Sequence, residues 1–114
     1  MLEITGLITI PTAGTRIALI DQTLLTAVLG QFKTCQAVNL QAWHANTGRI
    51  FIGKSTLVAA TGVGVGHVLA IPISNFIPSF GIANVGRAAG VDLSIIYLDA
   101  SVSGEGVLVT LLIT

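Results

Sequence analysis

The sequence predicts an all-β protein, a β-sandwich or jelly-roll-like barrel of about seven or eight short strands with at most one short helix. Apolar and polar residues alternate with a period of two in several short segments. Gly, Pro, Asn and Ser residues recur between these segments at near-regular spacing, as turns do in sandwiches and barrels. Because 114 residues show no linker and no repeat, we expect a single β-sandwich domain spanning residues 1–114.

The N-terminal part predicts two strands and the only helix. Residues 2–10 alternate as a half-buried strand, with Gly6 interrupting the phase, and residues 16–20 form a second short strand. Asp21 is expected to cap a helix of at most three turns, with an irregular connection as the alternative. The apolar positions at helical spacing are Leu24, Leu25, Val28, Leu29 and Phe32.

The central stretch, residues 34–53, predicts a β-hairpin around which the chain is organised. Its turn is expected at residues 44–48, where Asn and Gly tolerate the positive φ of a tight reversal. The alternation of both arms favours the register that places Trp43 opposite Arg49 and keeps Ile50 on the apolar face.

Further strands are predicted in the C-terminal half. The expected ranges are 55–60, 67–77, 91–97 and 105–114, with connections at 61–66 and 78–90. Pro72 places its strand at a sheet edge or a bulge, because proline lacks the N–H that a ladder needs. The last strand is apolar on both faces, which predicts a central position or cover by a neighbouring subunit.

The composition predicts an outer surface that other molecules cover. Hydrophobic residues make up 53% of the chain and charged residues only 9%, against about 25% charged in ordinary soluble domains. Mean hydropathy is +0.90. Monomers seldom expose large apolar patches, so we expect the protein to form a homo-oligomer. A formal net charge of zero argues against nucleic acid as a partner.

A membrane is not the expected cover. Residues 55–86 contain no Asp, Glu, Lys or Arg, but glycines and prolines interrupt the stretch and no aromatic belt flanks it. We therefore expect no transmembrane helix, and membrane association stays a minor alternative. The single cysteine, Cys35, permits no internal disulfide and fits synthesis in a reducing cytoplasm. Residues 1–5 lack the basic region of a secretory signal.

No catalytic, cofactor-binding or metal-binding residue is predicted, and we do not expect an enzyme. Residues 48–55 match the phosphate-loop pattern, but their Arg-Ile-Phe-Ile centre predicts a strand. His44 and His67 are not at metal-ligand spacing. Asp92 and Asp99 leave an acid–base pair open, although solvated charges at strand ends are the more ordinary interpretation.

Five residues are candidates for an interface between subunits. Trp43, Arg49 and Phe51 are expected on one face of the hairpin, and Trp and Arg are over-represented at interface hot spots. A cation–π contact or ordinary cross-strand packing are the alternatives. Leu108 and Leu112 join them, because the last strand is apolar on both faces.

Two blocks of sequence resemble a known group. The first is a strand ending in Gln41-Ala42, a turn Asn-Thr-Gly, and a strand ending in Gly53-Lys54-Ser55; the second runs over residues 92–100 and 104–109. Together they cover roughly half of the chain. In these blocks the sequence is similar to small structural proteins of tailed bacteriophages. It departs from their pattern after Pro72, where no Gly follows.

The resemblance implies a β-sandwich or jelly-roll virion protein of the head decoration (cement) type. It implies a homo-oligomer, expected to be a trimer, that is made in the host cytoplasm and binds the major capsid protein or another virion protein at the capsid surface. A tail, neck or fibre component is the first alternative. A carbohydrate- or receptor-binding module that uses Trp43, His44 and Asn46 is the second.

Overall fold

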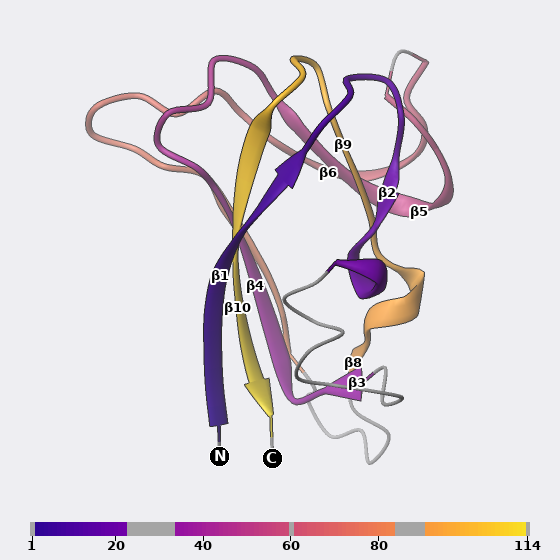
Figure 1. Ribbon diagram of the computed structural model, residues 1–114, viewed down its shortest axis with the longest axis vertical. Helices are drawn as coiled ribbons and strands as arrows, with labels where there is room; N and C mark the ends of the chain where they lie inside the picture. Colours follow the sequence, from indigo (N-terminus) through magenta and orange to yellow (C-terminus); the bar gives the residue numbers. More distant parts are fainter. Residues whose placement is uncertain (1, 23–33, 60, 84–90, 114) are drawn as a thin grey trace.

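A computed structural model describes residues 2–22, 34–59, 61–83 and 91–113 of the chain. Two antiparallel four-stranded sheets face each other (Figure 1), with strand orders β1-β10-β4-β7 and β2-β9-β5-β6. Helix in the described part of the chain is limited to two short 3-10 turns. The predicted all-β sandwich class is therefore confirmed.

The first sheet contains β1 (Leu2–Ile10), β10 (Glu105–Ile113), β4 (Ala37–Ala42) and β7 (Ser79–Ala83). The second sheet contains β2 (Ile17–Ala18), β9 (Tyr97–Ala100), β5 (Ile50–Val58) and β6 (Val63–Leu69). A small third pair joins β3 (Thr34–Cys35) to β8 (Val91–Asp92), and the 3-10 turns are η1 (Leu19–Asp21) and η2 (Leu93–Ile95).

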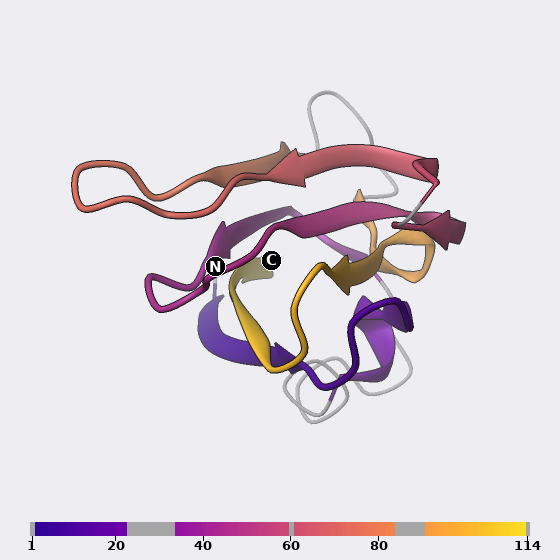
Figure 2. The same ribbon diagram turned by 90° about the horizontal axis from the view of Figure 1, so that it is seen from above.

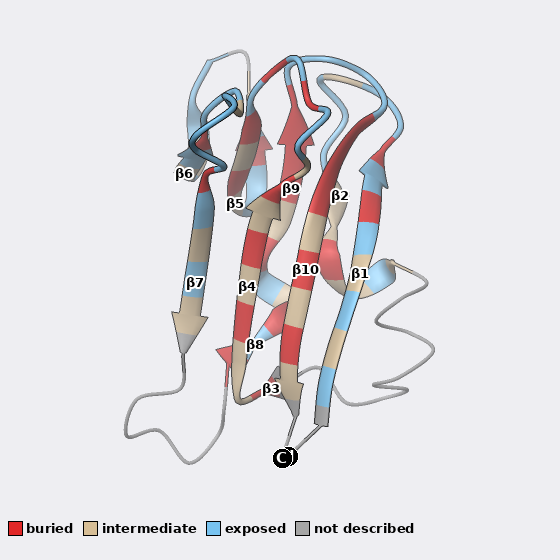
Figure 3. Ribbon diagram, turned by 90° about the vertical axis from the view of Figure 1, so that its left-hand side faces the viewer, coloured by how far each residue is buried: buried red, intermediate tan, exposed pale blue. Residues whose placement is uncertain are grey.

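The core lies between the two sheets and follows from period-two alternation. Along β4 and, from Val107 onward, along β10, buried residues alternate with half-buried ones (Figure 3), because successive side chains point to opposite faces. The inward residues include Leu40, Val107 and Val109 from the first sheet, and Ile50 and Leu98 from the second. Strand β10 lies between β1 and β4, so the predicted central position of the last strand is confirmed.

The predicted central hairpin is wrong. Strands β4 and β5 lie in opposite sheets: Ala42 pairs with Val107, whereas Ile50 pairs with Ala100 and Leu69. The chain crosses from one sheet to the other over residues 43–49. Alternation specifies which residues face the core, and this set is the same for a hairpin and for a crossover between two facing sheets.

Several predicted strand boundaries also differ. Strand β5 joins the second hairpin arm to the segment predicted at 55–60, and β6 begins inside the predicted connection at 61–66. Strand β7 occupies part of the segment predicted as a loop. Small residues favoured a loop there, but pairing with β4 along one edge is sufficient to hold β7 as a strand.

The ends of two other predicted elements are corrected as well. The strand expected at 91–97 is divided by η2, because the Asp92 side chain accepts a hydrogen bond from the Ser94 N–H (2.9 Å) and starts a turn. Strand β6 ends at Leu69, so the strand predicted at 67–77 stops before Pro72. Strand β6 does lie at a sheet edge, as predicted for the strand near Pro72, and so does β7. Asp21 is the last residue of η1; from residue 23 onward, the predicted helix lies outside the described residues.

Candidate functional site

The crossover at residues 43–49 is hydrogen-bonded to the start of β10. The buried Asn46 amide donates to the Gly106 carbonyl (2.8 Å) and accepts from the Gly106 N–H (2.8 Å). The Trp43 N–H also donates to the Gly106 carbonyl (3.1 Å). The Asn46 side chain thus makes the same pair of hydrogen bonds to Gly106 that the backbone of a neighbouring antiparallel strand would make. These bonds fix the direction of the crossover.

Glu105 holds the other half of the same turn. Its buried Oε1 accepts hydrogen bonds from the Thr47 N–H (2.8 Å), the Thr47 hydroxyl (3.2 Å) and the Gly48 N–H. These donors stabilise a carboxylate that would otherwise be expensive to bury. A Cβ at Gly48 would crowd Ser101 Oγ and would lie 2.7 Å from Val102 Cγ2, so glycine lets these two exposed side chains pack against the turn. The two sequence blocks that carry the phage resemblance therefore contact each other here.

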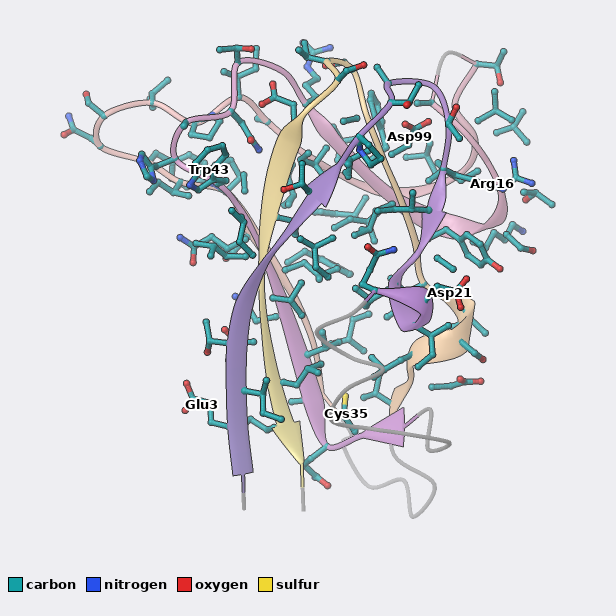
Figure 4. The ribbon with its side chains drawn as sticks, in the orientation of Figure 1. Glu3, Arg16, Asp21, Cys35, Trp43 and Asp99 are labelled. Carbon is teal, nitrogen blue, oxygen red and sulfur yellow. The ribbon has the colours of Figure 1, made fainter. Side chains whose placement is uncertain are left out.

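Trp43 is positioned by this turn on the outer face of the first sheet (Figure 4). It is half-buried and lies over Gly106, where an added Cβ would be 3.0 Å from Trp43 Cε3 and 2.9 Å from Leu7 Cδ1. The ring meets His44 edge to face, with centroids 5.7 Å apart. Trp43 and the exposed Leu7 thus form a small apolar patch at the upper end of this sheet.

Leu108 and Leu112 lie on the same outer face, because they alternate with the buried residues of β10. Leu112 lines a shallow hollow of about 360 Å³ that crosses all four strands of the sheet. Glu3 on β1 and Asn39 on β4 also line this hollow. Three of the five interface candidates therefore share one surface.

The other two candidates lie elsewhere. Phe51 pairs with Asp99 and Val68 and is half-buried on the outer face of the second sheet. Arg49 is exposed on the crossover, where its N–H donates to Ser101 Oγ (2.8 Å). The prediction that Trp43, Arg49 and Phe51 share a hairpin face is wrong; the contact of each residue with a partner stays a prediction.

A projecting loop is the most apolar exposed feature of the described surface. We call residues 70–78, between β6 and β7, the arm; it extends beyond the body of the molecule in two perpendicular views (Figures 1 and 2). Ile73 and Phe76 exchange two backbone hydrogen bonds (2.9 and 3.0 Å), which close a tight tip at Ser74-Asn75. At its base, the Pro78 carbonyl accepts from the Ala42 N–H (2.9 Å), next to Trp43.

Four large apolar side chains are exposed on the arm. Their exposed fractions are 46% for Ile71, 65% for Ile73, 60% for Phe76 and 39% for Ile77. Sequence reasoning missed this surface, because Leu69, Ile71 and Ile73 recur with a period of two, which predicts a strand over residues 67–77. The signal that could have found it is Pro72, which ends ladder pairing in the middle of the alternation.

An open groove of about 550 Å³ lies beside the arm, between the edges of the two sheets. We call it the inter-sheet groove. His67 of β6 stacks on Phe80 of β7, with ring centroids 4.4 Å apart, and so joins the two sheets along it. The lining is mainly apolar and contains Ile52, Val65, His67, Phe80, Ile82 and Ile95, with Lys54 among the remaining residues.

The carboxylates do not form an acid–base pair. Asp92 lies in the small β3-β8 pair, whereas Asp99 is fully buried in the second sheet. Asp99 Oδ1 accepts from the N–H groups of Gly14 (3.0 Å) and Ala100 (2.7 Å), while Oδ2 has no hydrogen-bond partner among the described residues. Asp99 therefore ties the loop after β1 to β9.

The phosphate-loop match, the possible metal ligands and the cysteine do not form a site in the described ranges. Residues 50–55 lie within β5, so the phosphate-loop match is a strand, as predicted. No group of three or more metal-ligating side chains lies together in these ranges. Cys35 is buried, and burial raises the pKa of its thiol. None of the helices in these ranges has the length and apolar character needed to cross a membrane.

The fold and surface define an antiparallel β-sandwich with a projecting apolar arm. No protein-family model, curated protein or solved structure matches the chain.

Proposed function

We propose that this chain is a structural virion protein of a tailed bacteriophage, a capsid decoration (cement) protein. It forms homo-oligomers and binds the lattice of the major capsid protein by burying apolar surface. The observation that supports this proposal best is the arm, which exposes four large apolar side chains in a chain with five basic and five acidic residues. Monomers rarely leave such side chains together in water.

The outer face of the first sheet is the surface that we assign to the capsid. Trp43, Leu108 and Leu112 lie on it, and aromatic anchors on a broad surface are typical of protein interfaces. An interface of about 1,600 Å² at about 25 cal/mol per Å² corresponds to about 40 kcal/mol of gross burial, before the costs of association. That amount leaves ample room for stable attachment.

A carbohydrate-binding role has less support. Both functional atoms of the Asn46 amide are engaged by Gly106 in the interior, so this side chain does not offer hydrogen bonds to a sugar. Trp43 is half-buried against the sheet, and its ring already contacts His44 edge to face. A tail, neck or fibre component would also bind its partner by burying apolar surface. It would differ from a capsid decoration protein only in its location in the particle.

The test combines solution mass with location in the particle. Light scattering of the purified protein at micromolar concentration is expected to give a mass above that of the 11.7 kDa monomer. Mass spectrometry of purified virions of the encoding phage is expected to detect the chain, and a cryo-electron microscopy reconstruction is expected to place it on the head. Absence from the particles would refute a virion role, and density confined to the tail or neck would replace decoration by attachment.

A further inference from the structure

We propose that the arm of one copy docks into the inter-sheet groove of a second copy, so that two copies exchange arms about a two-fold axis. This inference deepens the assembly part of the proposed function and rests on it. It names the partner of the arm, which is another molecule of the same chain.

The arm is built to be covered. Residues 70–78 contain no charged side chain, and Ile73 and Phe76 are the most exposed of its large apolar residues. Because these two residues also close the tip through their backbone hydrogen bonds, the apolar side chains are presented on a preformed turn. Docking such a turn requires little ordering of the chain, which favours association.

The groove matches the arm in chemistry. Its lining is mainly apolar, and its ionisable members are Lys54 and His67. Lys54 is exposed, so its ammonium group can remain in water at the rim when the groove is filled. An uncharged arm adds no charge to this site, and docking therefore avoids the penalty of burying an unpaired ion.

The arm cannot fold back into the groove of its own molecule. The groove is lined by β6 and β7, and the arm begins where β6 ends and finishes where β7 starts. The arm continues outward along these strands, away from the body (Figure 2). In the proposed dimer the two hairpins lie antiparallel, so that the tip of each arm docks into the groove of the other copy.

The areas involved favour reciprocal exchange. A large apolar side chain offers roughly 150–250 Å², so the exposed fractions of the four arm residues correspond to about 400 Å². The open lining of the groove is smaller than the exposed surface of the arm, so one contact buries about 500 Å² in total, which is within the range of crystal-packing contacts. Two reciprocal contacts bury about 1,000 Å², the lower limit for a specific interface. In a ring such as a trimer, each interface contains only one arm–groove contact and therefore buries half of this area.

The first experiment measures dimerisation in arm variants by analytical ultracentrifugation. Ile73→Ser and Phe76→Ser are each expected to raise the dimer dissociation constant at least about 100-fold, because each removes a large buried side chain at the contact centre. Leu7→Ser is the matched control: it removes another exposed apolar side chain, outside the arm and groove, and is expected to change the constant less than about threefold. Circular dichroism verifies that all three variants fold.

The second experiment places one cysteine on the arm and one in the groove of different copies. An Ile73→Cys chain is mixed with an Ile95→Cys chain under mild oxidation, while Cys35 remains because it is buried. A disulfide-linked heterodimer is expected within minutes. The control pairs Ile73→Cys with Thr5→Cys, an exposed position on β1, and is expected to cross-link at least about tenfold more slowly.

The outcomes separate this inference from the proposed function. If the wild-type chain is oligomeric and present in virions, but Phe76→Ser dimerises normally or the Ile95→Cys pair links no faster than the control, arm exchange is refuted and the virion role stands. If arm exchange occurs and the chain is missing from virions, the inference stands and the virion role fails. A wild-type chain that is monomeric at micromolar concentration refutes arm exchange and oligomeric assembly together.

Discussion

Replacing Asn46 by alanine is expected to loosen the crossover between the sheets and to destabilise the whole sandwich. The amide makes two buried hydrogen bonds of 2.8 Å, both with Gly106. Alanine removes both and leaves the Gly106 N–H buried without an acceptor. The Gly106 carbonyl retains one donor, the Trp43 N–H.

The expected loss follows from these bonds. Each hydrogen bond contributes a net of about 0.5–1.5 kcal/mol, and a buried donor without a partner costs about 1–3 kcal/mol. Because the Gly106 carbonyl remains partly satisfied, we expect the free energy of unfolding to fall by about 2–4 kcal/mol. With a denaturant slope of about 1.5 kcal/mol/M for a domain of this size, the urea midpoint falls by about 1.3–2.7 M.

The assay is urea unfolding followed by circular dichroism at one fixed protein concentration, since oligomerisation changes apparent stability. Asn39→Ala is the matched control. Asn39 is half-buried on the outer face of β4, and its side chain donates no hydrogen bond within the described part of the chain. This control is expected to lose less than about 1 kcal/mol. Equal losses in the two variants, or a loss below about 1 kcal/mol at Asn46, would refute the assigned role.

Three further predictions use the same measurement. Glu105→Ala is expected to lower the unfolding free energy by about 2–4 kcal/mol, and Glu105→Gln by about half as much, because glutamine keeps an acceptor oxygen for the turn; equal losses would contradict this. Gly53→Ala is expected to cost more than about 2 kcal/mol, because the added Cβ would overlap the Gly64 carbonyl, whereas Gly66→Ala places its Cβ 3.6 Å from the nearest atom and is expected to cost less than about 1 kcal/mol. Burial raises the pKa of the Cys35 thiol above 9.0; the folded state therefore resists ionisation, and its stability is expected to fall as pH rises above 9.0 in the wild type but less in Cys35→Ala. A wild-type stability that does not change in that range would count against a buried thiol.

The sequence alone determined the class of fold and the apolar face of the strand that follows residues 43–49. Alternation placed Ile50 on the apolar face, and Ile50 is buried in the core, because the side-chain period of a strand is two whatever its neighbour is. Because the last strand is apolar on both faces, the sequence predicted either a central position or cover by a neighbouring subunit, and the structure places β10 between β1 and β4. Low charge predicted an apolar surface, which the structure locates mainly on the arm, with further exposed apolar side chains on both sheets, including Leu7 on the first sheet and Val63 and Val68 on the second.

Only the tertiary structure decided which strands are neighbours and where the apolar surface gathers. Residues 43–49 form a crossover because Asn46 bonds to Gly106, 60 residues away, and Gly48 donates to Glu105, 57 residues away. Such long-range contacts leave no trace in local periodicity. For the same reason, alternation at Ile71 and Ile73 could not distinguish a core strand from an exposed arm. A pattern of side chains specifies a face, whereas the partner of that face depends on long-range contacts.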